Sequence, residues 1–214
     1  MRTERIPIAR EGVPFIGYTV FLTVTCALLG FQIATLVLVL ISTFVLMFFR
    51  DPDRITPADS DAVIAPADGK VIVVEQVVDE RFCPERVWKI SIFMNIFNVH
   101  VNRIPIAGTI EHISHVPGVF MAADNKDAHL KNEYCALTIG VKENVRLTVV
   151  QIAGLIARRI VCRTEPGETV RAGERYGLIR FGSRLDLYLP ITATITTEVG
   201  QKSRAGESIL ARLN

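Results

Sequence analysis

The sequence predicts a mostly β protein of the α+β kind, in which an N-terminal helical hairpin embedded in a membrane precedes a β-rich domain. Residues 13–49 carry no charged side chain. Residues 63–214 contain short runs of β-branched and apolar residues that are interrupted at brief intervals by Gly and Pro. Such punctuation is typical of a sandwich or barrel. A Gly-x-x-x-Arg-Ala-Gly-Glu pattern also occurs twice, at 167–174 and 200–207.

The composition excludes several classes of protein. Half of the 214 residues are hydrophobic, which argues against a disordered chain. The formal net charge of +2 argues against a general nucleic-acid binder, which would carry a marked basic excess. The cysteines are scattered without metal-ligand spacing, so we expect no metal site and a reducing compartment. They are Cys26, Cys83, Cys135 and Cys162.

Residues 1–12 are expected to form a cytoplasmic segment and residues 13–49 a membrane anchor. A spanning helix needs about 20 apolar residues, so this run is too long for one simple span and suits two short ones. We expect the break near Gly30-Phe31-Gln32. A single tilted or kinked helix and a buried helix pair of a soluble protein are the alternatives. Basic residues flank both ends of the run, which places both ends in the cytoplasm. They are Arg2, Arg5, Arg10, Arg50 and Arg54.

A polar linker at 50–62 leads into a domain at 63–214 that is long enough to bury its own core. We expect strands within 63–78, with a turn at Asp68-Gly69, and within 87–106. A hairpin is predicted within 135–161, with its turn near 142–144, and a strand pair or bent strand within 177–190. Residues 116–133 lack periodicity and are predicted to form a long functional loop, with Phe120 and Met121 directed toward the lipid interface.

The repeated glycine pattern predicts two similar strand–turn–strand units, because Gly permits tight bends. The segment Val63–Val71 has a related pattern. Together these segments resemble the half-motifs of lipoyl/biotinyl-like barrel-sandwich folds. Coincidental turn chemistry is the alternative.

Among the four histidines, His100 stands out because Asn102 and Arg103 follow it in an otherwise apolar, strand-like segment. Polar groups in such a segment must find partners or face a cleft. His112 and His115 lack a nearby third metal ligand, and we interpret them as ordinary surface residues. His129, in the polar loop, is expected to be solvated.

The segment Phe181-Gly182-Ser183-Arg184 suggests a different chemistry. It is not a GxSxG elbow, so a plain serine hydrolase is poorly supported. A serine hydroxyl that follows Gly can attack the preceding carbonyl carbon and convert the peptide bond into an ester, provided a nearby base activates it. β-Elimination of that ester leaves dehydroalanine, which hydrolyses to an N-terminal pyruvoyl group.

With these segments in their order, the chain resembles phosphatidylserine decarboxylase proenzymes of the short, membrane-anchored bacterial and archaeal form. The matching segments cover most of 48–190. They are FFRDPDR, APADGKV, SIFMNIFNVHVNRIPIAG, VPGVF, Asn132-Glu133 and IRFGSRLDLYLP.

The resemblance implies self-cleavage between Gly182 and Ser183, which gives a β chain of 1–182 and an α chain of 183–214. Ser183 would become the covalent pyruvoyl cofactor, which forms a Schiff base with the substrate amine. His100 would be the base of self-cleavage and the proton donor of decarboxylation, and Asp68 would orient it. Longer family members carry two histidines in this segment, and Arg103 stands where the second would be. Either His100 serves both steps or another group takes one.

The implied activity is the conversion of phosphatidylserine to phosphatidylethanolamine and CO2 at the cytoplasmic face of the inner membrane, without a metal or diffusible cofactor. The expected partners are the phospholipid in its membrane and the α and β chains themselves, with higher oligomers left open. Candidate substrate-binding residues are Asn102, Arg103 and Arg184. The alternatives are a membrane-anchored lipoyl-like adaptor and an inactive, unprocessed homologue.

Overall fold

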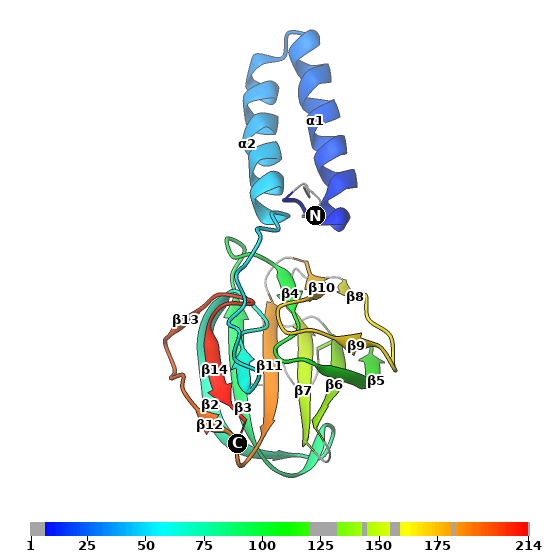
Figure 1. The fold of residues 1–214 in the computed structure, drawn as a ribbon. Coiled ribbons are helices and arrows are strands. Elements are labelled where there is room, and N and C mark those ends of the chain that lie inside the picture. The colour runs from blue at the N-terminus through cyan, green and yellow to red at the C-terminus, as the bar shows by residue number, and fades with distance from the viewer. Residues whose placement is uncertain (1–6, 120–131, 143–144, 155–158, 181–182, 214) are drawn as a thin grey trace. The chain divides into compact units, whose positions relative to one another are not determined.

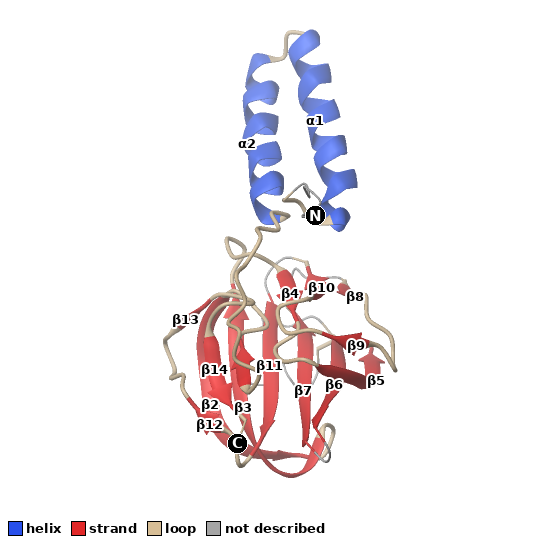
Figure 2. Ribbon diagram, in the orientation of Figure 1, coloured by secondary structure: helices blue, strands red, loops and turns tan. Residues whose placement is uncertain are grey.

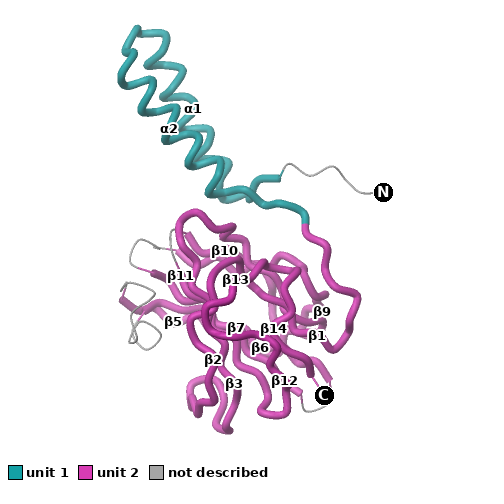
Figure 3. The backbone as a smooth tube through the Cα atoms, turned by 90° about the vertical axis from the view of Figure 1, so that its left-hand side faces the viewer, with its two compact units in different colours: residues 1–53 teal, residues 54–214 magenta. Residues whose placement is uncertain are grey.

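The computed structural model describes residues 7–119, 132–142, 145–154, 159–180 and 183–213. The chain divides into two compact units, residues 1–53 and residues 54–214 (Figure 3). The first unit is helical, and the regular elements described in the second unit are all strands (Figures 1 and 2). A mostly β fold with an N-terminal helical hairpin is therefore confirmed.

The helical unit contains a short 3-10 turn, η1 (Arg10–Gly12), and the antiparallel helices α1 (Val13–Leu28) and α2 (Gln32–Phe48). The chain reverses at Gly30, whose φ of 78° favours glycine, so the predicted break is confirmed. Thr23 and Ser42 share a hydrogen bond of 3.2 Å between the helices. Most of the large apolar side chains on both helices are exposed. The membrane location of the hairpin stays a prediction.

The open end of the hairpin is tied together by backbone and ring contacts. The Ala9 N–H donates to the Phe49 carbonyl at 2.8 Å, and the Phe15 and Phe49 rings stack with centroids 5.5 Å apart. Gly12 leaves room for Phe49, because a Cβ at this position would lie 2.4 Å from its ring. Of the described helical segments, Arg10–Leu28 has the length and composition to cross a membrane, whereas Gln32–Phe48 has only 17 residues.

The β unit is dominated by one eight-stranded antiparallel sheet that curls into a half-barrel, in the order β13-β2-β3-β11-β7-β6-β5-β9. Two three-stranded sheets, β1-β14-β12 and β4-β10-β8, accompany it. The strands are β1 (Ala62–Ile64), β2 (Gly69–Asp79), β3 (Cys83–Met94), β4 (Val101–Arg103), β5 (Gly108–Val116), β6 (Tyr134–Lys142), β7 (Val145–Ala153), β8 (Ile160–Cys162), β9 (Thr169–Val170), β10 (Arg175–Ile179), β11 (Ser183–Pro190), β12 (Thr194–Ile195), β13 (Lys202–Ser203) and β14 (Ile209–Arg212).

Several local predictions can be compared with these strands. The β6–β7 hairpin closes at the Lys142–Val145 pair, as its sequence predicts. The segment 177–190 forms two strands that belong to different sheets, β10 and β11. The predicted loop at 116–133 falls mostly outside the described residues, and so do Phe120, Met121 and His129.

The two glycine-rich repeats adopt matching backbone conformations. Gly167 and Gly200 have φ values of 89° and 100°, and Gly173 and Gly206 both have φ of 79°. These values lie in the left-handed region, where glycine avoids the clash of a Cβ. The sequence repeat therefore corresponds to a repeated turn geometry.

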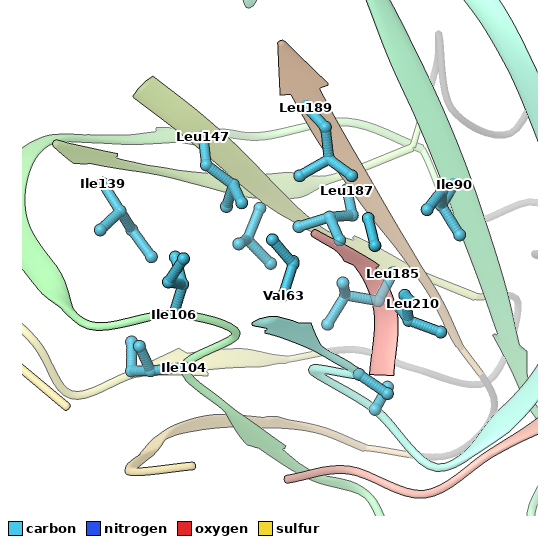
Figure 4. Packing of buried hydrophobic residues seen from close by; sticks show 14 of the residues in the cluster. Val63, Ile90, Ile104, Ile106, Ile139, Leu147, Leu185, Leu187, Leu189 and Leu210 are labelled. Atoms are coloured by element: carbon cyan, nitrogen blue, oxygen red, sulfur yellow. The ribbon is translucent and has the colours of Figure 1, made fainter. Parts of the chain in front are cut away.

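The main core lies between the large sheet and the small β1-β14-β12 sheet. Leu185, Leu187 and Leu189 of β11 pack in one cluster with Val63 of β1 and Leu210 of β14 (Figure 4). Each of these side chains is at most 1 % exposed. The small sheet thus covers the inner face of the large one and fixes the position of β11.

Candidate active site

Ser183 is the first residue of β11, the strand that pairs with both β3 and β7. Its direct neighbours across the sheet are Met94 on β3 and Ala153 on β7. The side chain is fully buried, and its hydroxyl donates to the Met94 sulfur at 3.4 Å. A thioether is a weak acceptor, so this contact holds the hydroxyl only loosely. Gly182, the other residue of the predicted cleavage bond, lies outside the described residues.

Asn102 on β4 reaches the same sulfur. Its Nδ2 donates to Met94 Sδ at 3.8 Å, and its Oδ1 accepts a hydrogen bond of 2.8 Å from Gln151 Nε2. Asn102 and Gln151 are 0 % and 1 % exposed. The structure therefore brings Ser183 and Asn102 together at Met94, and Gln151 contacts Asn102.

Sequence reasoning missed Gln151 as a member of this site. It lies on β7, in a segment in which every side chain from Leu147 to Ala153 is buried. A glutamine in such a strand is a signal in itself, because a buried amide needs polar partners. The sequence of β7 alone does not show that Gln151 hydrogen-bonds Asn102, or that Asn102 in turn contacts the Met94 sulfur.

His100 immediately precedes β4 and is fully buried. Its Nδ1 lies 3.0 Å from the Asn98 carbonyl oxygen. A carbonyl oxygen can only accept, so Nδ1 carries a proton in this contact, and in the neutral ring the lone pair is then on Nε2. This tautomer is the one required of a base that acts through Nε2, and the role of His100 as that base stays a prediction.

Asp68 lies in a second neighbourhood, just before β2. Its Oδ2 accepts from Arg54 at 2.9 Å, and its Oδ1 accepts from the Ala205 backbone N–H at 2.7 Å. Arg54 also contacts Glu207 at 3.3 Å. Among the described residues, the hydrogen bonds of Asp68 are these two and do not include His100. An orienting role toward His100 stays a prediction.

The two predicted substrate-binding arginines are both buried. Arg103 is 5 % exposed and donates to the Gly173 carbonyl at 3.0 Å. Arg184 is 4 % exposed, and it contacts Asp186 at 2.6 Å and Ser91 at 2.8 Å. Side chains alternate along a strand, so Arg184 points to the face of the sheet opposite to Ser183. Substrate binding by Arg103, Arg184 and Asn102 stays a prediction.

The interior of the β unit holds further polar groups. Gln151 Oε1 and the Tyr176 hydroxyl are buried without a hydrogen-bond partner in the described part of the chain. Burial, together with the nearby Cys162 and Cys135, holds the pKa of Tyr176 well above its ordinary value. The structure shows all four cysteines as free thiols.

His112 and His115 lie on β5. His115 Nε2 is 3.1 Å from Glu133 Oε1 at an exposed position, and His112 is also exposed. Within the described ranges, no three His, Cys, Asp or Glu side chains gather as metal ligands would.

Comparison with known proteins gives one consistent result. The sequence profile of the phosphatidylserine decarboxylase family matches residues 41–211. A phosphatidylserine decarboxylase proenzyme of Desulfotalea psychrophila is 49% identical over 213 residues, covering all of both chains. A proenzyme of the same name from Nitratidesulfovibrio vulgaris is 49% identical over 212 residues, covering 99% of this chain and 97% of its own. One from Geotalea uraniireducens is 45% identical over 213 residues, again covering both chains fully.

Proposed function

This chain belongs to the phosphatidylserine decarboxylase family, and from that premise we propose that it converts phosphatidylserine to phosphatidylethanolamine and CO2. We propose further that the reaction uses a pyruvoyl group made from Ser183 when the chain cleaves itself between Gly182 and Ser183. The observation that carries the proposal is the position of Ser183: it is fully buried at the start of a central strand, with its hydroxyl on a weak acceptor.

The surroundings of Ser183 suit a small uncharged carbonyl group. Met94 and Ala153 flank it, and both are fully buried. An ionised group would be costly there, whereas a ketone needs only a hydrogen-bond donor. The Asn102 amide supplies a donor whose present acceptor is the same weak sulfur. The residues present therefore fit a pyruvoyl group at this position.

Self-cleavage needs a base and a nucleophile that is free to turn. Ser183 Oγ would attack the Gly182 carbonyl carbon while a base, His100 in this proposal, accepts the hydroxyl proton. The C–N bond breaks, and the ester that forms joins Gly182 to Ser183 Oγ. Loss of the Ser183 α-proton then expels the Gly182 carboxylate, and hydrolysis of the resulting enamine releases ammonia. Because Nδ1 of His100 is occupied by the Asn98 carbonyl, Nε2 is the nitrogen suited to accept a proton.

In the mature enzyme the pyruvoyl group would supply a carbonyl for the substrate amine and an electron sink for the electrons left by CO2. The chain's own residues would position the substrate and supply the proton that it takes up. His100 Nε2 is proposed to return a proton to the substrate α-carbon. Burial of the site excludes water, which strengthens each hydrogen bond made inside it.

The helical unit supports a membrane location for this reaction. Exposed apolar side chains cover both helices, and Arg10–Leu28 is long enough to cross a bilayer. A phospholipid with two acyl chains remains in the bilayer, so an anchored enzyme meets its headgroup at high effective concentration. We propose that the hairpin is this anchor and that the β unit acts at the cytoplasmic face, since arginines flank both hairpin ends.

The test compares the full chain with Ser183→Ala by intact mass under denaturing conditions. We expect two fragments from the first sample, cut between 182 and 183, with a pyruvoyl terminus on the smaller one. Ser183→Ala should stay whole, and Ser114→Ala, a change in a β5 serine away from the site, should cleave normally. Phosphatidylethanolamine should form from phosphatidylserine in mixed micelles only where cleavage occurs. One uncut mass in every sample would refute the proposal.

A further inference from the structure

Two cysteines from different sheets meet inside the β unit. Cys135 lies on β6 of the large sheet, and Cys162 lies on β8 of the small β4-β10-β8 sheet. They pack in one cluster with Ile160 and Ile179, and their thiols share a hydrogen bond. Both are free thiols, so a disulfide between them would join one sheet to the other.

The two thiols differ in their surroundings. Cys135 is 2 % exposed, whereas Cys162 is half-buried and its Sγ lies 3.4 Å from the Thr164 hydroxyl oxygen. The hydrogen bond from Cys135 lowers the pKa of the Cys162 thiol, against the effect of burial, and the contact with Thr164 lowers it further. The hydrogen bond with Cys162 and burial both raise the pKa of Cys135. Cys162 is therefore the thiol that ionises first, while Cys135 keeps its proton.

The titratable groups around the pair favour the same assignment. His115 on β5 lies opposite Cys135 in the β5–β6 ladder, and its charge when protonated adds to the lowering of the Cys162 pKa. Glu133 adds to the raising of the Cys135 pKa. Tyr176 on β10 stays uncharged at neutral pH, because burial holds its pKa well above the ordinary value. The nearby charges thus favour a thiolate at Cys162 and oppose one at Cys135.

The pair lies next to residues of the candidate active site. Cys135 is directly opposite Gln151 on β7, so the two side chains share a face of the large sheet. Cys162, Gly177 and Asn102 lie in one row across β8, β10 and β4. Gln151 in turn donates to Asn102. A bond between the two sulfurs would therefore close a ring of contacts that contains Asn102, and it would fix the small sheet against the large one.

We propose that Cys135 and Cys162 form a redox-active dithiol, which hydroperoxides oxidise to a disulfide between the two sheets. The Cys162 thiolate attacks one peroxide oxygen and breaks the O–O bond; the leaving oxygen takes up a proton, and Cys162 becomes a sulfenic acid. The Cys135 thiol then attacks the Cys162 sulfur, the S–S bond forms, and the sulfenic hydroxyl leaves with the Cys135 proton as water. Two thiols are oxidised and one peroxide is reduced, to water or to an alcohol and water. A half-buried thiolate beside a second thiol is the arrangement that this chemistry needs.

The test follows the cysteines of the full chain in detergent under hydrogen peroxide. Peptide mapping should find two peptides joined through Cys135 and Cys162, which a dithiol reductant separates. Cys83 is the matched control within the same chain, because it is also half-buried but burial raises its pKa. At pH 7 we expect iodoacetamide to alkylate Cys162 roughly 10-fold or more faster than Cys83. Equal rates would overturn the proposal, and so would peroxide treatment that leaves the pair unjoined.

Variants separate the roles of the two thiols. Cys135→Ser removes the thiol that closes the disulfide, so a 1,3-diketone reagent should trap the sulfenic acid at Cys162. Cys162→Ser removes the attacking thiolate and should leave Cys135 reduced under the same peroxide dose, whereas Cys83→Ser should still form the disulfide. A sulfenic acid at Cys135 in Cys162→Ser would contradict the assigned roles. If a variant does not fold, the mapping of the unchanged chain decides, and that result does not depend on self-cleavage because both cysteines precede residue 182.

Discussion

The two faces of β11 carry opposite kinds of residue. The inner face presents Ser183 followed by Leu185, Leu187 and Leu189, which belong to the main core. The outer face presents Arg184, Asp186 and Tyr188, which are also buried. Both faces belong to one eight-residue strand, so their difference comes from what the neighbouring strands place against them.

On the outer face the charged side chains form ion pairs with one another, although Asp186 Oδ2 accepts no hydrogen bond in the described part of the chain. Asp186 pairs with Arg184 at 2.6 Å and with Lys89 at 3.4 Å, and Arg184 also donates to Ser91. On the inner face the polar hydrogens of Ser183 and Asn102 meet only the Met94 sulfur in the contacts described. Strongly paired polar groups hold a structure in place, whereas weakly paired ones remain available for chemistry. The contrast distinguishes a face held by ion pairs from the face that carries the proposed nucleophile.

The largest effect should come from removing the shared anion of the outer face. Asp186→Asn leaves Arg184 and Lys89 buried without a counter-charge, which should lower the free energy of unfolding by about 3–5 kcal/mol. Denaturant unfolding in detergent, followed by the fluorescence of the single Trp88, measures this loss. The comparison uses a Ser183→Ala background, which would keep the chain whole under the proposed self-cleavage. Asp61→Asn breaks an exposed ion pair with Lys142 and should change the free energy of unfolding by less than about 0.5 kcal/mol. Equal effects of the two changes would contradict a structural role for the network.

A somewhat smaller loss is expected on the inner face. Leu187→Ala leaves a cavity in the main core and should lower the unfolding free energy by about 3 kcal/mol. The same fluorescence assay measures this loss. The control is Val78→Ala, at an exposed position of β2, which should change the free energy of unfolding by less than about 0.5 kcal/mol. A Leu187→Ala chain as stable as the control would mean that the face opposite the charge network contributes little to folding.

The smallest effect concerns the margin of the outer face, where the Tyr188 hydroxyl donates to Asp79. Burial alone would raise the pKa of Asp79, but hydrogen bonds from Arg81 and Tyr188 outweigh it and lower that pKa. The unfolded chain therefore binds the proton more readily. The stabilisation is present above the unfolded pKa, near 3.9, and is lost as the pH falls through the lower folded value.

Arg81→Gln should therefore cost stability at neutral pH but little at acid pH. We expect a difference from the unchanged chain of under about 1 kcal/mol at pH 7, since the pair is partly exposed. Unfolding curves at pH 7, 5 and 3 should show the difference shrinking only in the last step. A difference that grows on acidification would reverse the assigned sign.

Much of the local structure could be predicted from the sequence. The charge-free run with Gly30 near its middle predicts two helices, and the glycine repeat predicts two similar turns with positive φ. The β6–β7 hairpin follows from two β-branched runs around a short polar turn. These features depend on neighbours along the chain, where periodicity and turn chemistry act directly.

Which residues meet in the site depends on the register in which the strands pair. The sequence of a single strand does not determine that register. Ser183 meets Met94, almost ninety positions earlier, only because β11 pairs with β3 in one register. A shift of one residue would exchange Ser183 for Arg184 on the inner face. For the same reason three contacts could not be predicted before the sheet was known. They are the hydrogen bonds from Arg184 to Ser91, from Arg54 to Asp68 and from Gln151 to Asn102.

The central place of β11 bears on how the molecule could mature. A backbone cut just before this strand would leave its ladders with β3 and β7 intact, along with the pairing of β13 with β2 and of β14 with β1. The two pieces would be interleaved like a fragment-complementation pair, because the eight-stranded sheet and the β1-β14-β12 sheet would each contain strands of both pieces. Before the cut, refolding would be an intramolecular event; afterwards it would require two partners to meet, and its yield would depend on concentration. Self-cleavage would therefore convert a chain that can refold by itself into two pieces that must meet again in order to refold.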